Sequence, residues 1–578
     1  MPERFAIGID LGTSTCEVCV FRGGRAEPIP DPVTGNAVIP SLVALGEAGE
    51  VLVGEAAREL VDEPGRGVRE AKRKMGTDRR ILLGSESLRP QEVAALLLKH
   101  LRASAEAYVG QPVRQVVISV PANFDDKAKR ATQDAAAIAG LEVLLMMAEP
   151  TAAALAWGID HMAAEEQVLV FDFGGGTLDI TILEMFAGVM DVRCSFGDPR
   201  LGGKDFDDAM VGLLKAKVQA AAPGAALSPS LRRDIKAVAE QAKIALTSAP
   251  QAEVSLHEVG TESGGQVVSV EVTVSRAEFE EACEGLLQRT RECLLKALRS
   301  KDVRPSSIHR VLLIGGTSSI PAVRQVIEAT LGRAGTQGID PVLAVGMGAS
   351  IRAAQLTGLL DTATGPLITD VAPMGIGVSV LAPGGGRPVV VYEALIPPNT
   401  PIPSQVRKTY HLLATDQAHV PIQVFQDPTG RARVPAEAIA LRTAVLRDVV
   451  PSRTGRPHQI ELVLHYDPHG VLRLEAHIAA TRQGIVIEHR LTDAEMGPSE
   501  VQAATARMDG MWAARPASQP YRPLLERAER AMDALAPEAR AGLRAAVDAL
   551  ADAIASGDAA ACRSASTRLA DLLSGRES

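Results

Sequence analysis

The chain has 578 residues, of which 46% are apolar and 22% are charged. This balance is typical of a globular protein and excludes fibrous and intrinsically disordered classes. Its 60 Lys and Arg against 70 Asp and Glu give a formal charge of −10, so the chain has no excess positive field for polyanions. We therefore expect neither nucleic acid nor a membrane among its partners.

Targeting signals and cysteine usage favour a cytoplasmic protein. The N-terminal residues lack the apolar stretch of a signal peptide, and no run of about 18 apolar residues predicts a membrane span. Six cysteines scattered over the chain do not form a disulfide framework, which suits a reducing compartment.

Up to about residue 360, strand-like runs alternate with helical stretches, which predicts an α/β architecture. The expected strands lie at 116–120, 168–171 and 311–314, and the expected helices at 90–109, 125–139, 231–246 and 276–299. Gly, Pro and Thr interrupt both patterns at 358–373 and indicate a linker.

The remaining third of the chain changes character twice. Short β-type segments such as 421–425 and 459–464, separated by Pro and Gly turns, predict an all-β module over 374–497. The last 80 or so residues predict a short helical bundle, with apolar residues at helical spacing in Leu524, Leu525, Ala528, Met532 and Leu535.

Two glycine-rich turns carry the strongest chemical signal. Residues 7–15 (IGIDLGTST) and 170–179 (VFDFGGGTLD) each read as a strand, an acid, glycines with hydroxyl residues, and a second strand. Glycine permits close approach, so successive backbone N–H groups can converge on phosphate oxygens while hydroxyls add donors. Two such turns indicate a triphosphate clamped from both sides.

The acids of these turns, Asp10 and Asp172, predict a metal ion. A carboxylate beside a phosphate is repelled unless a cation lies between them, and Mg²⁺ is commonly held by one or two carboxylates with phosphates and water. We therefore expect both acids to hold Mg²⁺ through water, with ATP or ADP as the nucleotide.

A third glycine turn, LLIGGT at 312–317, reads either as an adenosine contact or as a tight turn from strand to helix. The chain has no Gly-x-x-x-x-Gly-Lys-Ser/Thr loop, no Gly-x-Ser-x-Gly elbow and no His-Glu-x-x-His pair. These absences disfavour P-loop NTPases and hydrolases of the two other kinds.

These motifs give the chain a family resemblance. Over nearly its whole length it resembles the DnaK-type seventy-kilodalton heat-shock chaperones, as a divergent bacterial-like member. The most specific matches are 8–13 (GIDLGT), 120–124 (VPANF), 149–156 (EPTAAALA), 171–179 and 201–207 (LGGKDFD). The resemblance implies an actin-like (ribonuclease H-like), two-lobed α/β ATPase domain at 1–361, a linker at 362–373, a β-sandwich peptide-binding domain at 374–497 and a short helical lid at 498–578.

The resemblance also implies the site residues. Lys72, in AKRKMG at 71–76, matches the catalytic lysine that stabilises γ-phosphate charge and orients the attacking water. The catalytic set is completed by Asp10, Asp172, Asp179, Thr177 and Glu149. The nucleotide-binding set is Gly12, Thr13, Ser14, Thr15, Gly174, Gly175, Gly176, Thr177, Gly202, Gly203, Glu240, Lys243, Thr247, Gly315, Gly316, Thr317 and Ser319.

Four positions depart from the family pattern. Lys129 replaces an arginine of the relay between domains and keeps its charge without the planar donor fork. Ser319 replaces the arginine that stacks on adenine, while Val342 and Lys204 stand at normally acidic places. A lost stacking partner costs about 0.5–2 kcal/mol, so we expect nucleotide binding to survive in weakened or less selective form.

The resemblance assigns further residues to the relay and to peptide binding. The expected relay consists of Pro121, Lys129, Glu149, Leu367, Ile368 and Asp370. Thr369 makes the linker less apolar than usual and its docking weaker. Leu381, Tyr410, Leu413 and Val420 fall either at positions of a groove for extended chains or in plain sandwich core.

The cysteines Cys16 and Cys19 have Cys-x-x-Cys spacing. On a strand, residues three apart point to opposite faces, so we expect neither a disulfide nor a shared metal ion.

The leading hypothesis is an ATP-dependent chaperone in which hydrolysis is coupled to closure of a groove around unfolded polypeptides, with a J-domain co-chaperone and a nucleotide exchange factor as partners. One alternative is a nucleotide-switched holding protein or exchange factor with little turnover. The other is a sugar kinase or filament-forming relative.

Overall fold

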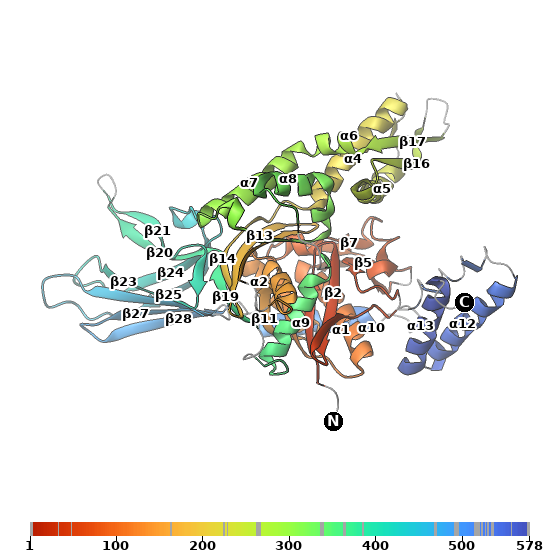
Figure 1. Ribbon diagram of the computed structural model, residues 1–578. Helices are drawn as coiled ribbons and strands as arrows, with labels where there is room; N and C mark the ends of the chain where they lie inside the picture. Colours follow the sequence, from red (N-terminus) through yellow and green to blue (C-terminus); the bar gives the residue numbers. More distant parts are fainter. Residues whose placement is uncertain are drawn as a thin grey trace.

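The computed structural model describes residues 4–574 except 33, 48, 162–164, 223–225, 228, 262–266, 336–339, 362–365, 384–386, 468–470, 491–495, 514–520, 522–523, 526–527, 529–530, 533–536 and 557. Its sheets and helices are arranged as Figure 1 shows, with the β-rich segment on one side and the last helices on the other.

The first large sheet carries the first glycine turn. Its strand order is β11-β10-β1-β2-β3, with β4 also paired to β2. The strands are β1 (Ala6–Leu11), β2 (Thr15–Arg22), β3 (Arg25–Pro28), β4 (Ile39–Pro40), β10 (Gln115–Val120) and β11 (Glu142–Ala148). Helices α1 (Pro90–Val109) and α2 (Asp126–Ile138) share a buried apolar cluster with β1, β2 and β10.

The second large sheet carries the second glycine turn and repeats the local pattern of the first. Its order is β18-β12-β13-β14-β19-β22. The strands are β12 (Glu166–Phe173), β13 (Leu178–Phe186), β14 (Val189–Asp198), β18 (Arg310–Ile314), β19 (Leu367–Ala372) and β22 (Thr400–Ile402). In both sheets the strand before the turn pairs antiparallel with the strand after it and parallel with a distant strand, β10 or β18.

The remaining elements of this part lie outside the two large sheets, and their strands form three small sheets of their own. The smaller strands are β5 (Leu42–Leu45), β6 (Val51–Val53), β7 (Gly67–Arg69), β8 (Ile81–Leu83), β9 (Glu86–Leu88), β15 (Ala226–Leu227), β16 (Gln251–Thr261) and β17 (Val267–Ser275). The helices are η1 (Gly54–Ala57), η2 (Ala71–Lys74), α3 (Glu149–Gly158), α4 (Gly203–Ala221), α5 (Pro229–Ser248), α6 (Arg276–Ala282), α7 (Glu284–Ser300), η3 (Pro305–Ser307), η4 (Gly316–Ser319), α8 (Pro321–Leu331) and α9 (Ala344–Leu356).

Local sequence signals explain where these helices begin and end. Helix α1 starts at Pro90, where the missing N–H costs nothing, and the Glu92 carboxylate accepts the backbone N–H of Arg89 at 2.7 Å. Its last residue is Val109, and the following residue, Gly110, adopts the left-handed conformation (φ 68°) that caps the helix. The single helix expected at 276–299 is in fact two, because the chain leaves helical geometry at Cys283 between α6 and α7.

The β-rich segment forms two four-stranded antiparallel sheets around one apolar cluster. Their orders are β21-β20-β24-β25 and β23-β26-β27-β28. The elements are β20 (Gly375–Ala382), β21 (Val389–Ile396), β23 (Ser404–His411), β24 (Val420–Asp427), η5 (Pro435–Glu437), β25 (Ile439–Leu446), β26 (Gln459–Tyr466), β27 (Val471–Ile478) and β28 (Gln483–Arg490). Alternate residues point inward, as period-2 patterning requires.

Part of the expected linker is a strand. Residues 362–365 lie outside the described residues, but β19 pairs parallel with β14 and antiparallel with β22. Thr369, expected to weaken docking, donates its hydroxyl to Asp191 on β14 and so adds a contact. The Gly, Pro and Thr content of this segment indicated a linker. The strand forms through pairing with β14 and β22, which lie far away in sequence.

Polar contacts join the β-rich segment to the first part of the chain. The Asp126 backbone N–H donates to the Gln426 side chain at 2.9 Å, and His489 lies 2.6 Å from the Asp126 carboxylate. The Asn399 side chain accepts the backbone N–H of Ser195 at 2.9 Å.

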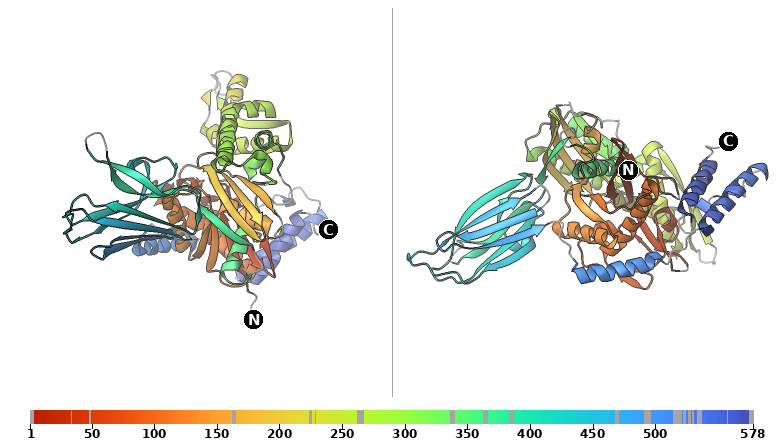
Figure 2. Two further views of the ribbon diagram at one scale, coloured as in Figure 1. Left: turned by 60° about the vertical axis from the view of Figure 1, so that its left-hand side comes forward. Right: turned by 90° about the horizontal axis from the view of Figure 1, so that it is seen from below.

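Helix α10 (Pro498–Ala513) lies across α1 and α2, as the view from below in Figure 2 shows. Ala504 and Met508 are buried in the same apolar cluster as these two helices. Lys99 of α1 pairs with Asp509 at 2.5 Å, and Glu92 pairs with Arg507.

Helices α12 (Pro537–Ser556) and α13 (Ala559–Ser574) form a separate cluster with Leu524, Ala528 and Met532. Leu535, predicted to join it, lies outside the described residues. None of the helices in the described part of the chain is long and apolar enough to cross a membrane.

Candidate functional site

A cavity of about 330 Å³ opens between the two large sheets, where their glycine turns face each other. Its wall includes residues of both turns, the η2 segment and helices α4, α5 and α9. Twenty of the sequence-predicted or motif-matched positions line it: Asp10, Gly12, Thr13, Ser14, Thr15, Lys72, Glu149, Asp172, Gly174, Gly175, Gly176, Thr177, Gly203, Glu240, Lys243, Thr247, Gly315, Gly316, Thr317 and Val342.

The two turns lie so close together that side chains of the first turn fill the space beside the glycines of the second. A Cβ placed on Gly175 would lie 1.9 Å from the Ser14 hydroxyl oxygen, and one on Gly176 would lie 2.6 Å from that of Thr13. The second turn is held from behind by α4, because Gly203 N–H donates to the Gly174 carbonyl at 3.0 Å. The arrangement is a cradle of backbone and hydroxyl groups that is suited to phosphate.

Lys72 enters the cavity from η2 and meets Glu149, the first residue of α3. The Nζ to Oε1 distance is 2.5 Å and both side chains are about nine-tenths buried. Burial alone would lower the pKa of Lys72, but Glu149 and Asp10 together raise it above its ordinary value. Lys72 is therefore a fixed positive charge inside the cavity.

Four carboxyl groups surround this lysine. Burial raises the pKa of Glu149 to about 7 and that of Asp179 to about 6. Burial also raises the pKa of Asp10 and Asp172, and Glu149 and Asp179 raise that of Asp172 further. One lysine does not compensate four buried acids, so the site favours an additional cation.

This donor set fits Mg²⁺ held through water. Asp10 and Asp172 lie on the cavity wall from opposite sheets, at the strand ends that precede the two phosphate cradles. Among the residues that the structure describes, no group of three or more His, Cys, Asp and Glu has the arrangement of a direct metal site. Mg²⁺ prefers to keep several waters and to bind one or two carboxylates together with phosphates.

The far end of the cavity is more apolar. Ile244, Ile320 and Val342 line it together with Thr247, while Lys243 pairs with Asp207 at 2.7 Å. Ser319 ends η4 and is not part of the lining. Its neighbour Ile320 does line the cavity, so the place of Ser319 beside adenine stays a prediction.

Two other predicted residues support the wall from behind. Asp179 is buried and accepts the Asn123 side-chain N–H at 2.6 Å. A Cβ on Gly202 would lie 2.5 Å from Gly175, so this glycine lets α4 approach the second turn.

Sequence reasoning missed several residues of the site. Ser119 donates its hydroxyl to Asp10 at 2.5 Å from the end of β10, and Asp207 forms the ion pair of Lys243. Glu17 is register-paired with Asp10 as Asp179 is with Asp172, and it accepts the Gly346 backbone N–H at 2.8 Å. The repeated strand-turn-strand pattern is the signal from which Glu17 could have been found, because Asp179 holds the same position in the second repeat.

The expected relay residues are spread over several elements, and Glu149 lies in the cavity wall. Pro121 directly follows β10, and Leu367, Ile368 and Asp370 belong to β19. Leu367 and Ile368 are register-paired with Val189 and Met190 of β14. Burial lowers the pKa of Lys129 on α2, while the negative charges of Asp370, Asp126 and Asp125 oppose this shift.

The four predicted peptide-binding residues divide into two kinds. Leu381 and Leu413 are 45% and 65% exposed, unusual for leucine, so these two are not core. Val420 is buried in the apolar cluster, as the core alternative expects. Tyr410 packs against the cluster, and its hydroxyl donates to Glu393 at 2.7 Å.

The cysteines carry no visible chemistry. Cys16 and Cys19 are free, buried thiols on β2. Burial raises the pKa of Cys16 to about 12, which makes it a poor nucleophile.

Comparison with known proteins identifies the family. The family model of the Hsp70 protein matches residues 6–82 and 79–573. The chain is 37% identical over 484 residues to the chaperone protein DnaK of Cenarchaeum symbiosum (strain A), covering 82% of this chain and 71% of that protein. With a match of this extent and a cavity between paired glycine turns, the chain belongs to the Hsp70 family of ATP-dependent molecular chaperones and is an ATPase.

Proposed function

We propose that ATP hydrolysis in the cavity controls the binding of extended, apolar segments of unfolded polypeptides by the β-rich segment. The observation that carries this proposal is the contact between Lys72 and Glu149 inside the cavity. Lys72 stands at the phosphate end, while Glu149 begins α3 and belongs to the expected relay. A change at the phosphates therefore reaches an element that packs against both large sheets.

The roles of the residues follow from charge and position. Lys72 stabilises negative charge that develops on the transferred phosphoryl group, since hydrolysis of this kind depends on positioning and charge neutralisation. Thr13 and Thr177 donate hydroxyls to phosphate oxygens, and Asp179, held by Asn123, orients the attacking water. Bound Mg²⁺ would neutralise phosphate charge, with Asp10 and Asp172 holding its water ligands.

We assign the domains as 1–361 for an actin-like ATPase domain, 362–373 for the linker, 374–497 for the β-sandwich and 498–578 for a helical lid. Leu381 and Leu413 are the peptide contacts best supported by their exposure. Unfolded polypeptides, a J-domain co-chaperone and a nucleotide exchange factor are the proposed partners, and a cytoplasmic location remains a prediction.

Single-turnover hydrolysis tests the proposal. Purified chain and its Lys72→Ala variant are loaded with ATP, and product is followed with and without an unfolded peptide. We expect slow hydrolysis that peptide accelerates, and a loss of at least about 100-fold on substitution, with ATP binding retained.

The matched control is Lys74→Ala, because Lys74 lies in the same short helix but outside the cavity wall. Equal losses in the two variants would contradict the role of Lys72. Tight ATP binding without turnover in the unsubstituted chain would overturn the proposed cycle in favour of a nucleotide-switched holding protein.

A further inference from the structure

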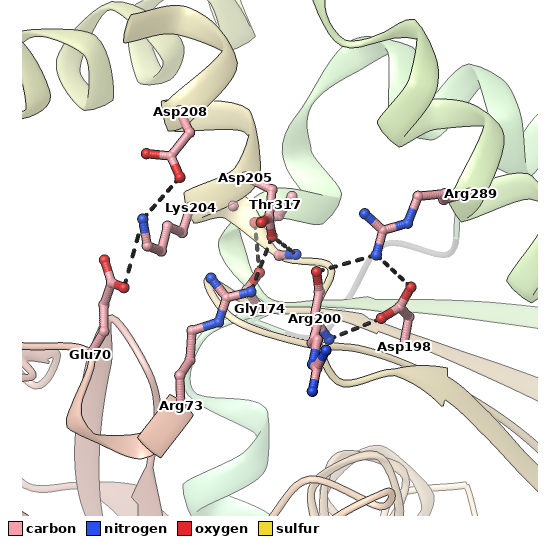
Figure 3. Close-up of polar contacts among 12 residues, drawn as sticks. Glu70, Arg73, Gly174, Asp198, Arg200, Lys204, Asp205, Asp208, Arg289 and Thr317 are labelled. Carbon is pink, nitrogen blue, oxygen red and sulfur yellow. Dashed lines mark hydrogen bonds and ion pairs between the residues drawn. The ribbon is translucent and has the colours of Figure 1, made fainter. Parts of the chain in front are cut away.

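Two ion pairs of opposite polarity join the η2 segment to the first turn of α4, beside the cavity (Figure 3). Lys204 Nζ lies 3.9 Å from the Glu70 carboxylate and 3.0 Å from that of Asp208 on its own helix. Arg73 lies 3.3 Å from Asp205. One segment contributes an acid and a base, and the other contributes a base and an acid.

The backbone at Glu70 sets this geometry. Glu70 adopts the left-handed conformation (φ 58°, ψ 32°), which is costly for a residue with a Cβ and points to a local function. It is the residue directly before η2, the helix that brings Lys72 into the cavity. The turn that places the Glu70 carboxylate near α4 is therefore the same turn that aims Lys72.

The other end of the contact is the support of the second glycine turn. The backbone N–H of Lys204 donates to the Gly175 carbonyl at 2.9 Å, and that of Gly203 donates to the Gly174 carbonyl. Thr317 donates its hydroxyl to the Gly174 carbonyl at 2.8 Å, and Arg289 holds the incoming chain through Asp198 at 2.7 Å. Figure 3 shows the Thr317–Gly174 and Arg289–Asp198 contacts near the start of α4.

We infer that the pairs Glu70–Lys204 and Arg73–Asp205 form an ionic brace that positions Lys72 against the glycine turn at 174–177 and retards release of ADP. The inference rests on the nucleotide-binding role proposed for this cavity. Glu70 and Lys204 are positioning residues, because they act through η2 and through the backbone of the turn. We call the two pairs the rungs of the brace. Charge reversal at Glu70 or Lys204 leaves both side chains of the other rung unchanged.

The pairs are about a quarter exposed, which limits their strength. Exposed or half-exposed pairs are individually weak and are screened by salt. The brace is therefore expected to slow ADP release by a modest, salt-dependent factor.

Charge reversal in the full-length chain tests the brace. Glu70→Lys, Lys204→Glu and the double variant are loaded with fluorescent ADP, and its dissociation rate is measured by displacement with unlabelled ATP. We expect each single reversal to accelerate dissociation about two- to tenfold, and the double reversal to return to within about twofold of the unsubstituted chain. Single-turnover hydrolysis should follow the same order.

Asp208→Asn is the matched control, because it removes the partner of Lys204 on its own helix and leaves both rungs in place. Its dissociation rate should stay unchanged or fall. Raising salt from 50 to 500 mM should accelerate dissociation from the unsubstituted chain more than from a Glu70→Gln/Lys204→Gln variant.

Unchanged dissociation in both single reversals, or a double variant as fast as the faster single one, overturns the brace. ADP release does not require Lys72 to be catalytic, so this result is separable from a failure of the Lys72→Ala experiment. Thermal unfolding of each variant identifies any that has simply lost its fold.

Discussion

Glu149 is the residue at which burial and charge compete most visibly. Its carboxylate pairs with Lys72, yet desolvation prevails and raises its pKa to about 7. A carboxyl group with a pKa above that of the unfolded chain binds more protons in the native state, so its contribution lowers stability as pH rises through that interval. This pH dependence of stability has the opposite sign to that of a carboxylate in an ordinary surface ion pair, whose pKa is lowered in the native state.

We predict that Glu149→Gln flattens the pH dependence of the free energy of unfolding in nucleotide-free, metal-free protein. Between about pH 4.5 and 7 the unsubstituted chain should lose stability relative to the variant. The shift from 4.5 to about 7 sets the loss at no more than about 3–4 kcal/mol. Urea unfolding at a series of pH values measures it.

Glu142→Gln provides the comparison, because that carboxyl group is exposed at the start of β11. Its pH profile should coincide with that of the unsubstituted chain. A Glu149→Gln profile that also coincides would show that Glu149 ionises normally.

The site divides into residues that contiguous motifs reveal and residues that only the fold brings in. Asp10, Asp172 and their glycines were predictable because each turn lies within ten residues of chain. Ser119 and Asp207 were not, because their contacts depend on the end of a neighbouring strand and on one face of α4. The role of Ser319 stays a prediction, because the matched motif does not fix which way the end of η4 points.

At the scale of elements, close packing of the two glycine turns creates the cradle. The space beside Gly175 is filled by the Ser14 hydroxyl at 1.9 Å from any added Cβ, which is far inside van der Waals contact. A methyl group there must displace the Ser14 hydroxyl from the cradle, since both turns are anchored by strand pairing.

We predict that Gly175→Ala weakens ATP binding by at least about tenfold, which corresponds to about 1.4 kcal/mol. Isothermal titration of the full chain with ATP measures it. The matched substitution is Gly212→Ala in α4, where nothing lies within 4 Å of an added Cβ. That variant should bind ATP normally and gain about 0.5–1 kcal/mol of stability from better helix propensity. Equal affinity in the two alanine variants would contradict the cradle.

Element boundaries were predictable where periodicity was long and end signals were local. Helix α1 begins and ends where the pattern placed it, at Pro90 and Val109. Strand β19 was not predictable from composition, because its partners, β14 and β22, begin more than 170 residues before it and close to 30 residues after it. Long-range pairing supplied what the local sequence lacked.

At the scale of the whole molecule, helix α10 completes the apolar cluster of the first sheet. Ala504 and Met508 are fully buried against α1 and α2, and Trp512 packs beside them. The order of the segments along the chain is a prediction from composition shifts. Their docking could not be predicted in this way, because it depends on pairs such as His489 with Asp126 that are more than 300 residues apart.

We predict that Ala504→Asp releases α10, because a carboxylate cannot be buried in this cluster without a partner. In a Trp157→Phe background Trp512 is the remaining tryptophan, since the chain has two. Its emission should shift to longer wavelength on release. Ala506→Asp, on the exposed face of the same helix, should leave the emission unchanged. A shift of the same size in both variants would show that α10 is not held by this face.

The docking of α10 has a consequence for synthesis of the chain. Glu92 and Arg507 are separated by 415 residues. At about 5–20 residues per second, a ribosome needs about 20–80 s to make that interval. During this time α10 has not yet been made, so the apolar side chains of α1 and α2 that pack against it are exposed on the nascent chain. A protein that shields such side chains in others passes through the same state while it is being made.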